Sequence, residues 1–269
     1  MGEHSYVTAV SADGRYFEDQ HGAPLLVFGD SPWAGPVRWS PPQAEHYFAN
    51  REAHGFNASI VSLIGSRANG GPGDDGRTAD GILPFVDGDV TRWNEPYWQR
   101  LDDLVRAACA HGNTLFLYPI DGWTVSTVFR GASLEDARRF GEMVAERYAR
   151  FPNIVWMTGG DHFPSDLPGR HDSPPVHDEL FHEVLSGIRS KALSPSTFIR
   201  LPWVSWQAPK TVRTDMAGPN LMALFADLTT GNSDETLVLD FSSSQSDVAG
   251  AVTVSEGDKA EAVRDLLGN

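Results

Sequence analysis

Four aspartates stand at or just past the ends of short apolar runs, near the positions where buried strands would end. They are Asp30, Asp121, Asp161 and Asp240. Parallel strands that end at one edge of a sheet bring such carboxylates together, and hydrolysis of a glycosidic bond needs two of them. One donates a proton to the leaving oxygen, and the other acts as nucleophile or base. The two stand roughly 5–5.5 Å apart in retaining enzymes and roughly 6.5–9.5 Å apart in inverting ones.

Asp161 has the clearest sequence context of the four. It follows Ile154-Val155-Trp156, a short β-branched run that is typical of a strand covered on both faces. Gly159 and Gly160 then free the backbone from φ restrictions and let a ligand approach closely. On spacing alone, a carboxylate that merely caps the following turn fits equally well, so both interpretations stay open.

Aromatic side chains that could stack on sugar rings follow the same strand ends. The candidates for substrate contact are Trp33, Trp123, Trp203 and Trp206, with His162 and the carboxylates Asp30 and Asp121. Packing in the core is the alternative for each single tryptophan. Their clustering after strand ends also fits a binding cleft.

No sequence pattern indicates a metal or a cofactor, and we expect neither. There is no His-Glu-x-x-His pair for zinc and no Gly-x-Ser-x-Gly elbow for a serine hydrolase. Asp74, Asp75 and Asp80 lie in a Gly-rich loop and could hold calcium, but they lack the EF-hand spacing. A solvated loop is the simpler interpretation. That loop also lacks the Gly-Lys-Ser/Thr sequence of a phosphate cradle.

Length and composition fit a single domain over residues 1–269. An α/β barrel uses about 250 residues, and this chain has 269, of which 41% are hydrophobic. Its formal net charge of −15 repels nucleic acids and anionic membranes, which leaves a small molecule or carbohydrate as the expected partner. The one cysteine, Cys109, excludes an internal disulfide and is expected in a helix core. No signal peptide or membrane span is visible, so we expect a cytoplasmic protein unless a leader was removed.

Strand and helix signals alternate along the first 190 residues. Strands are predicted at 25–28, 57–63 and 114–120 and through Ile154-Val155-Trp156. Helices are predicted from the cap Ser40 to the stop Gly55, from Asn94 to Gly112, from the cap Ser133 onward, and through Phe181, Val184 and Ile188. Such repeated units predict parallel strands, in a closed barrel or an open doubly wound sheet.

Polar and aromatic residues at several strand ends favour the barrel. A nucleotide-binding sheet would instead carry a Gly-rich turn where Gly29-Asp30-Ser31-Pro32-Trp33 stands. We therefore expect an α/β fold, a TIM-type (β/α)8 barrel. Beyond residue 195 only candidate strands at 198–203, 221–228 and 237–241 and a helix at about 256–267 follow. The barrel is thus expected to be incomplete or modified at strands seven and eight, and completion by a second chain or an oligomer stays open.

Taken together, these segments resemble the apiosidase-like family of barrel glycoside hydrolases. They match in order over about residues 12–165: Arg15-Tyr16-Phe17, Gly29-Asp30-Ser31-Pro32-Trp33, His54-Gly55-Phe56-Asn57, Leu83-Pro84-Phe85-Val86-Asp87-Gly88-Asp89, Asn94-Glu95-Pro96-Tyr97-Trp98, Phe151-Pro152-Asn153-Ile154-Val155-Trp156 and Gly159-Gly160-Asp161. A fainter match, Leu239-Asp240-Phe241, lies near that family's sixth strand. The resemblance implies a (β/α)8 barrel in which Asp161, after strand four, is the general acid/base.

The C-terminal part departs from the family pattern, in which a glutamate nucleophile ends strand seven. If Asp240 belongs to strand six, as the Leu-Asp-Phe match favours, the sequence stops before strand seven. Glu256 and Glu261 lie in a polar helical stretch and are poor substitutes. If 198–203 and 221–228 are strands five and six, Asp240 ends strand seven and could be the nucleophile.

Two functional classes follow. The first is a glycoside hydrolase-like enzyme acting on a glycosidic substrate, furanosides included, with Asp161 and Asp240 as catalytic residues. The second is a non-hydrolytic descendant: a sugar-binding or partner protein, or a biosynthetic enzyme that reuses the cleft. The Asp30 and Asp161 segments favour the first class, whereas the missing signal peptide and glutamate favour the second.

Overall fold

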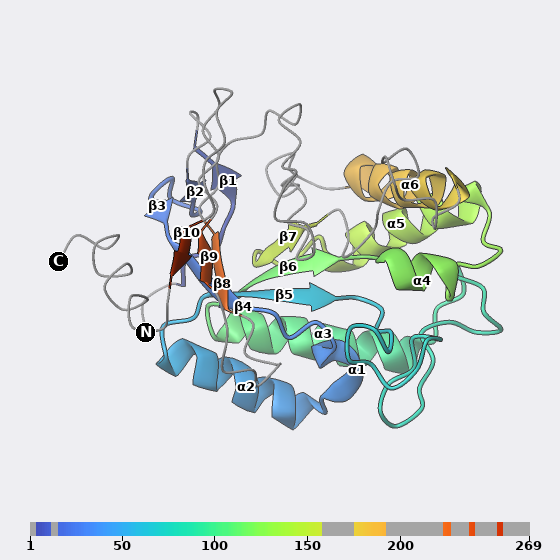
Figure 1. Cartoon of the computed structure of the whole chain (residues 1–269), viewed down its shortest axis with the longest axis horizontal. Helices are drawn as coiled ribbons and strands as arrows, with labels where there is room; N and C mark the ends of the chain where they lie inside the picture. Colours follow the sequence, from blue (N-terminus) through green and yellow to red (C-terminus); the bar gives the residue numbers. More distant parts are fainter. Residues whose placement is uncertain are drawn as a thin grey trace.

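The computed structural model describes residues 4–11, 16–157 and 175–191 and three short strands nearer the C-terminus. Its centre is a five-stranded parallel sheet with the order β7-β6-β5-β4-β8 (Figure 1). The strands are β4 (Val27–Asp30), β5 (Ala58–Ser62), β6 (Thr114–Tyr118), β7 (Ile154–Trp156) and β8 (Ala223–Ala226). Strands adjacent in the chain from β4 to β7 are also neighbours in the sheet, so the expected α/β alternation is confirmed.

The four predicted helices are present as α2 (Pro41–Ala53), α3 (Glu95–Ala110), α5 (Leu134–Tyr148) and α6 (Pro175–Lys191). Two short helices that were not predicted accompany them, α1 (Gly35–Arg38) and α4 (Gly122–Ser126). Capping boxes form at Ser40 and Ser133. Gly55 and Gly112 follow the C-caps of α2 and α3 with φ of 79° and 65°, values that cost glycine little.

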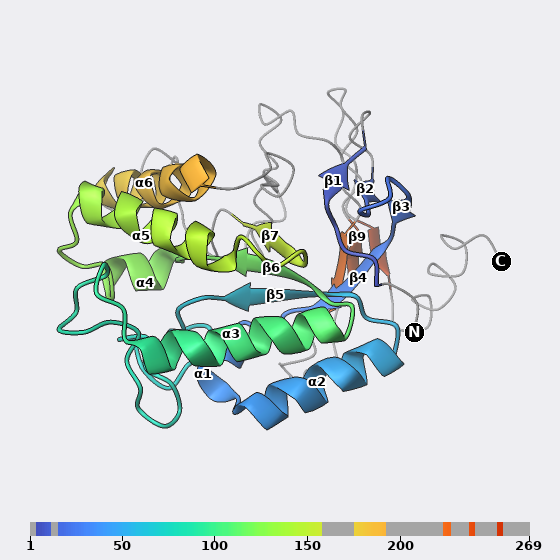
Figure 2. The same ribbon diagram turned by 180° about the vertical axis from the view of Figure 1, so that it is seen from behind.

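The two faces of the sheet carry two separate sets of buried side chains. On the outer face, Leu115, Leu117 and Trp156 pack in one cluster with apolar residues of α2, α3, α5 and α6. On the inner face, Phe116 and Val155 pack with a smaller cluster that includes Val27 and Ala58. Successive strand residues point to opposite faces, and burial on both sides explains why these strands are mostly apolar. Figure 2 shows α2 and α3 along one side of the sheet.

A small antiparallel sheet covers the amino end of the parallel strands (Figures 1 and 2). It consists of β1 (Ala9–Val10), β2 (Phe17–Glu18) and β3 (Pro24–Leu25), and Phe17 packs edge-on against Phe116 at a centroid distance of 6.0 Å. The strand predicted at 25–28 is therefore divided between β3 and β4. Next to this sheet, two asparagine side chains connect neighbouring strands. Asn57, directly before β5, bonds to the residue before β4, and Asn153, directly before β7, bonds to the residue before β6. The Nδ2 groups of these asparagines donate to Leu26 O (2.7 Å) and Asn113 O (3.0 Å).

The C-terminal strands differ from both sequence assignments. The strand expected at 221–228 exists as β8, but it pairs with β4 instead of taking the place of a fifth or sixth strand. The segment before Asp240 forms β9 (Leu237–Leu239), which pairs antiparallel with β10 (Val252–Val254) outside the parallel sheet. The β-branched run Val252-Thr253-Val254, which the sequence analysis did not assign, favours this pairing. The segments 198–203 and 256–267 lie outside the described residues. None of the described helices is long and apolar enough to cross a membrane.

Candidate active site

The carboxyl ends of β4 to β7 form the edge where the sequence places its candidate residues. The long connection 63–94, after β5, and the short helix α4, after β6, both lie at this edge (Figure 1). Backbone bonds extend the sheet toward them, because Trp33 O accepts from Ser62 N at 3.1 Å and Tyr118 O accepts from Leu63 N at 3.1 Å. Side chains that follow these strands are therefore held close together.

Asp121 is fully buried directly beyond β6 and forms the N-cap of α4. Its Oδ1 accepts from the backbone N–H groups of Trp123 (3.0 Å) and Thr124 (2.7 Å), and Oδ2 accepts from Asn69. Burial raises the pKa of this carboxyl to about 6, although those hydrogen bonds act in the opposite direction. These capping bonds make Asp121 a positioning residue for α4, and its contact with substrate stays a prediction.

Asn69 is a site residue that the sequence analysis missed. Its Nδ2 donates to Asp121 Oδ2 at 3.2 Å, and its Oδ1 accepts from Ser66 N at 2.8 Å. One buried amide thereby ties the connection after β5 to the residue that caps α4. The signal that could have found it is the Asn-Gly turn at Asn69 and Gly70, where Gly70 has a φ of 91°.

Trp33 and Trp123 are the described tryptophans with surface available at this edge. Trp123, in the first turn of α4, is 37% exposed, and Trp33 is half-buried. Two other tryptophans pack against core residues. Trp156 lies on the outer face 6.3 Å from the Tyr148 ring, and Trp39 lies 4.4 Å from the Tyr47 ring. Because of its exposure and its rigid cap, Trp123 is the better placed for stacking on a ligand.

Asp30 ends β4 with its carboxylate directed at α2. It accepts a very short hydrogen bond from the Tyr47 hydroxyl, forms a 3.3 Å ion pair with Arg51, and lies 3.4 Å from Ser59 Oγ. Burial raises its pKa above the ordinary range of an aspartate, although Tyr47 and Arg51 favour the charged form. Asp30 thus joins sheet to helix, and a role in substrate contact stays a prediction.

The acidic loop that could have held calcium is neutralised by arginines. Asp74, Asp75 and Asp80 pair with Arg67, Arg77 and Arg100 respectively. Over the described residues, no group of three or more His, Cys, Asp or Glu side chains is arranged to hold a metal ion. Each carboxylate therefore already has a cation beside it.

Comparison with known families decides the relationship of this chain. The family model described as "Apiosidase-like, catalytic domain" matches residues 11–262. The chain belongs to the apiosidase-like family. No curated protein matches it.

Solved structures show the fold of this apiosidase-like chain. A family 5 glycoside hydrolase from Bacteroides vulgatus is similar with a TM-score of 0.57 and 22% identity, over 73% of this chain and 39% of that one. A protein described as "Glycoside hydrolase" is similar with a TM-score of 0.57 and 23% identity, over 73% of this chain and 40% of that one. A protein described as a putative glycoside hydrolase, also from Bacteroides vulgatus, has a TM-score of 0.54 and 15% identity, over 72% of this chain and 38% of that one. The likeness supports the expected TIM-type α/β fold, and the matched region spans about two-fifths of those chains.

Five predicted site residues of the apiosidase-like chain lie outside the described residues. They are Asp161, His162, Trp203, Trp206 and Asp240. The strand that leads toward Asp161 is described, and its faces are known. Val155 belongs to the inner cluster, with Met157 packed against it, whereas Ile154 and Trp156 belong to the outer one.

Proposed function

We propose that this chain is a glycoside hydrolase-like enzyme in which Asp161 is the general acid/base. The observation that carries the proposal is the family match over residues 11–262, which includes the Asp161 segment. The faces of β7 support it, since Val155 and Met157 are on the inner side. A general acid must reach the leaving oxygen, and the inner face at the carboxyl edge is the place to do so.

The second carboxylate of the proposal is Asp240. Neither Asp30 nor Asp121 is a good alternative, because both carboxylates are buried and bound to protein groups. A retaining or inverting mechanism needs a second carboxyl beside the scissile bond. The burial of Asp30 and Asp121 also favours a second candidate function, a non-hydrolytic descendant that binds the sugar without cleaving it. In that case the exposed Trp123 would contribute to binding with no turnover.

The test is hydrolysis of an aryl-glycoside panel that includes furanosides, with wild type, Asp161→Asn and Asp240→Asn. Loss of a general acid typically slows turnover by about 10²–10⁴-fold. Asp161→Asn should lose less on dinitrophenyl glycosides than on phenyl glycosides, because a good leaving group needs no proton. Asp87→Asn is the matched control, since the Asp87 side chain is 79% exposed.

Each outcome has a clear meaning. Equal turnover by wild type and Asp161→Asn removes Asp161 as the acid. No turnover by wild type, with sugar binding still detected by calorimetry, favours the non-hydrolytic candidate. A uniform loss on all leaving groups means that Asp161 acts in some way other than proton donation.

A further inference from the structure

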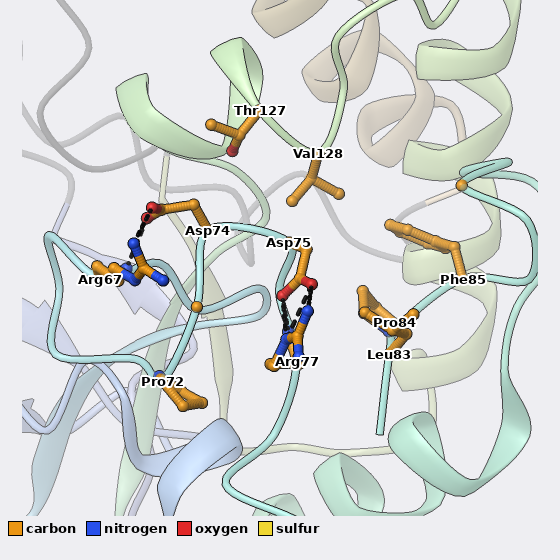
Figure 3. Close-up of a pocket in the computed structure, with 12 residues that line it drawn as sticks. Arg67, Pro72, Asp74, Asp75, Arg77, Leu83, Pro84, Phe85, Thr127 and Val128 are labelled. Atoms are coloured by element: carbon orange, nitrogen blue, oxygen red, sulfur yellow. Dashed lines mark hydrogen bonds and ion pairs between the residues drawn. The ribbon is translucent and has the colours of Figure 1, made fainter. Parts of the chain in front are cut away.

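A hollow of about 580 Å³ lies between the connection 63–94 and the end of α4 (Figure 3). Its volume is within the range of about 300–1,000 Å³ that small-molecule sites occupy. Arg67, Asp74, Asp75 and Arg77 form one part of the lining, and Leu83 and Val128 belong to an apolar part. None of these residues belongs to the catalytic proposal above.

The charged side chains of this hollow neutralise one another. The Arg77 Nε–H donates to both carboxylate oxygens of Asp75, at 2.8 Å and 2.9 Å. Asp74 lies 3.6 Å from the Arg67 guanidinium and also accepts from Arg67 N at 3.0 Å. The lining therefore has two negative and two positive groups and no net charge. The partly exposed guanidinium and carboxylate edges still offer donors and acceptors to a ligand.

The apolar part of the hollow is rigid. Phe85 is buried and packs at centroid distances of 6.0 Å from Trp98, 6.3 Å from Phe129 and 5.8 Å from Phe140. Leu83 is 41% exposed beside it. Figure 3 shows the Asp75–Arg77 pair between the Arg67–Asp74 pair and the side chains of Leu83 and Phe85. A ligand that fits must therefore present hydroxyl groups on one side and C–H groups on the other.

The hollow is connected to the candidate active site through two hydrogen bonds. Asn69, two residues after Arg67, bonds to Asp121. Thr127, which also lines the hollow, donates its hydroxyl to Trp123 O at 2.8 Å. The same two segments thus form the hollow and hold Trp123, so one extended ligand could contact both.

We propose that this hollow is a subsite for one neutral sugar ring of an oligosaccharide, remote from the bond that is cleaved; the inference rests on the proposed function. A neutral ring has hydroxyl edges for the ion pairs and an apolar face for Leu83 and Phe85. A uronate gains no net cation here and is repelled by a chain of net charge −15. A divalent cation finds each carboxylate already held by an arginine.

The experiment is calorimetry and saturation-transfer NMR on the full chain with cellotetraose, xylotetraose, mannotetraose and arabinotetraose, and with tetragalacturonic acid and CaCl₂. We expect at least one neutral tetrasaccharide to bind with a Kd that changes little between low and high salt, as expected for uncharged ligands. Leu83→Ala removes an exposed side chain and should weaken that binding by about tenfold. Val86→Ala, which truncates another exposed apolar side chain of the same connection that does not line the hollow, is the matched control.

A charge variant sharpens the test. Asp75→Asn keeps an oxygen for the Arg77 N–H but gives the hollow a net positive charge, so it should shift preference toward tetragalacturonic acid. Tighter binding of that acid or of Ca²⁺ by wild type overturns the proposal, as does binding of no neutral tetrasaccharide or an unchanged Kd in Leu83→Ala. Cleavage of aryl glycosides without tetrasaccharide binding refutes the subsite alone. Tetrasaccharide binding without any cleavage refutes the hydrolase and leaves the subsite standing.

Discussion

The side chain of Asn69 connects two loops at the carboxyl edge of the sheet through Asp121, across 3.2 Å from amide nitrogen to carboxylate oxygen. Both residues are buried, and their sequence separation is 52 positions. Asp121 in turn caps the helix that presents Trp123. The orientation of an exposed aromatic ring therefore depends on an amide in a different loop.

Asn69→Ala should lower the free energy of unfolding by about 1–3 kcal/mol, because it leaves Ser66 N and Asp121 Oδ2 without a partner. Urea unfolding followed by fluorescence measures the change. The exposed Gln99→Ala on α3 should change it by less than about 0.5 kcal/mol. A loss no greater than that of Gln99→Ala would show that water replaces the Asn69 amide without cost.

Asp121 should make stability depend on pH in the acidic range. Its pKa rises from 3.8 to about 6 in the folded protein, so the folded state holds the proton more tightly than the unfolded state. The contribution of Asp121 to the free energy of unfolding is complete below about pH 4 and is lost as the pH rises through about 6. Asp121→Asn should flatten the curve of unfolding free energy against pH in that window. The same slope in both proteins would assign the pH dependence to other groups.

His111 should make stability depend on pH in a higher range than Asp121 does. Burial lowers the pKa of His111, but hydrogen bonds to Glu52 (2.7 Å) and Glu45 (2.8 Å) outweigh it, so that the pKa is raised above the ordinary value of 6.5. The stabilisation is complete below pH 6.5 and is lost as the pH rises through the folded value. His111→Gln should therefore lower the melting temperature more at pH 6 than at pH 9. An equal loss at both values would mean that the imidazole acts through packing and not through its charge.

Arg51 holds the buried Asp30 carboxylate against α2. Its guanidinium lies 3.3 Å from Asp30 and about 5 Å from the ring centres of Tyr47 and Phe56. Arg51→Met should cost about 3–5 kcal/mol, because a buried charge loses its partner. A double-mutant cycle with Asp30→Asn measures the coupling in urea. We expect the double variant to lose less than the sum of the singles, and simple additivity would contradict a direct pair.

The helix boundaries were readable from the sequence because their causes are local. Ser40 with Gln43 and Ser133 with Asp136 form capping boxes within four residues, and Gly55 and Gly112 end the helices that precede them. The central strands were readable for the same reason, since a short apolar run needs cover on both faces. The strand at 25–28 was less accurately predicted, because only pairing with β2 and β5 divides it into β3 and β4.

Which way each side chain points was decided by the tertiary structure. Asp30 ends β4 and Asp121 follows β6, yet their carboxylates contact residues that are distant in the chain: Arg51, Tyr47 and Asn69. The hollow beside α4 likewise needs two segments that only the fold brings together. Sequence determined the order of elements and the family, because those depend on neighbouring residues and on recurring motifs. Side-chain surroundings depend on strand register and on distant partners, which no local pattern records.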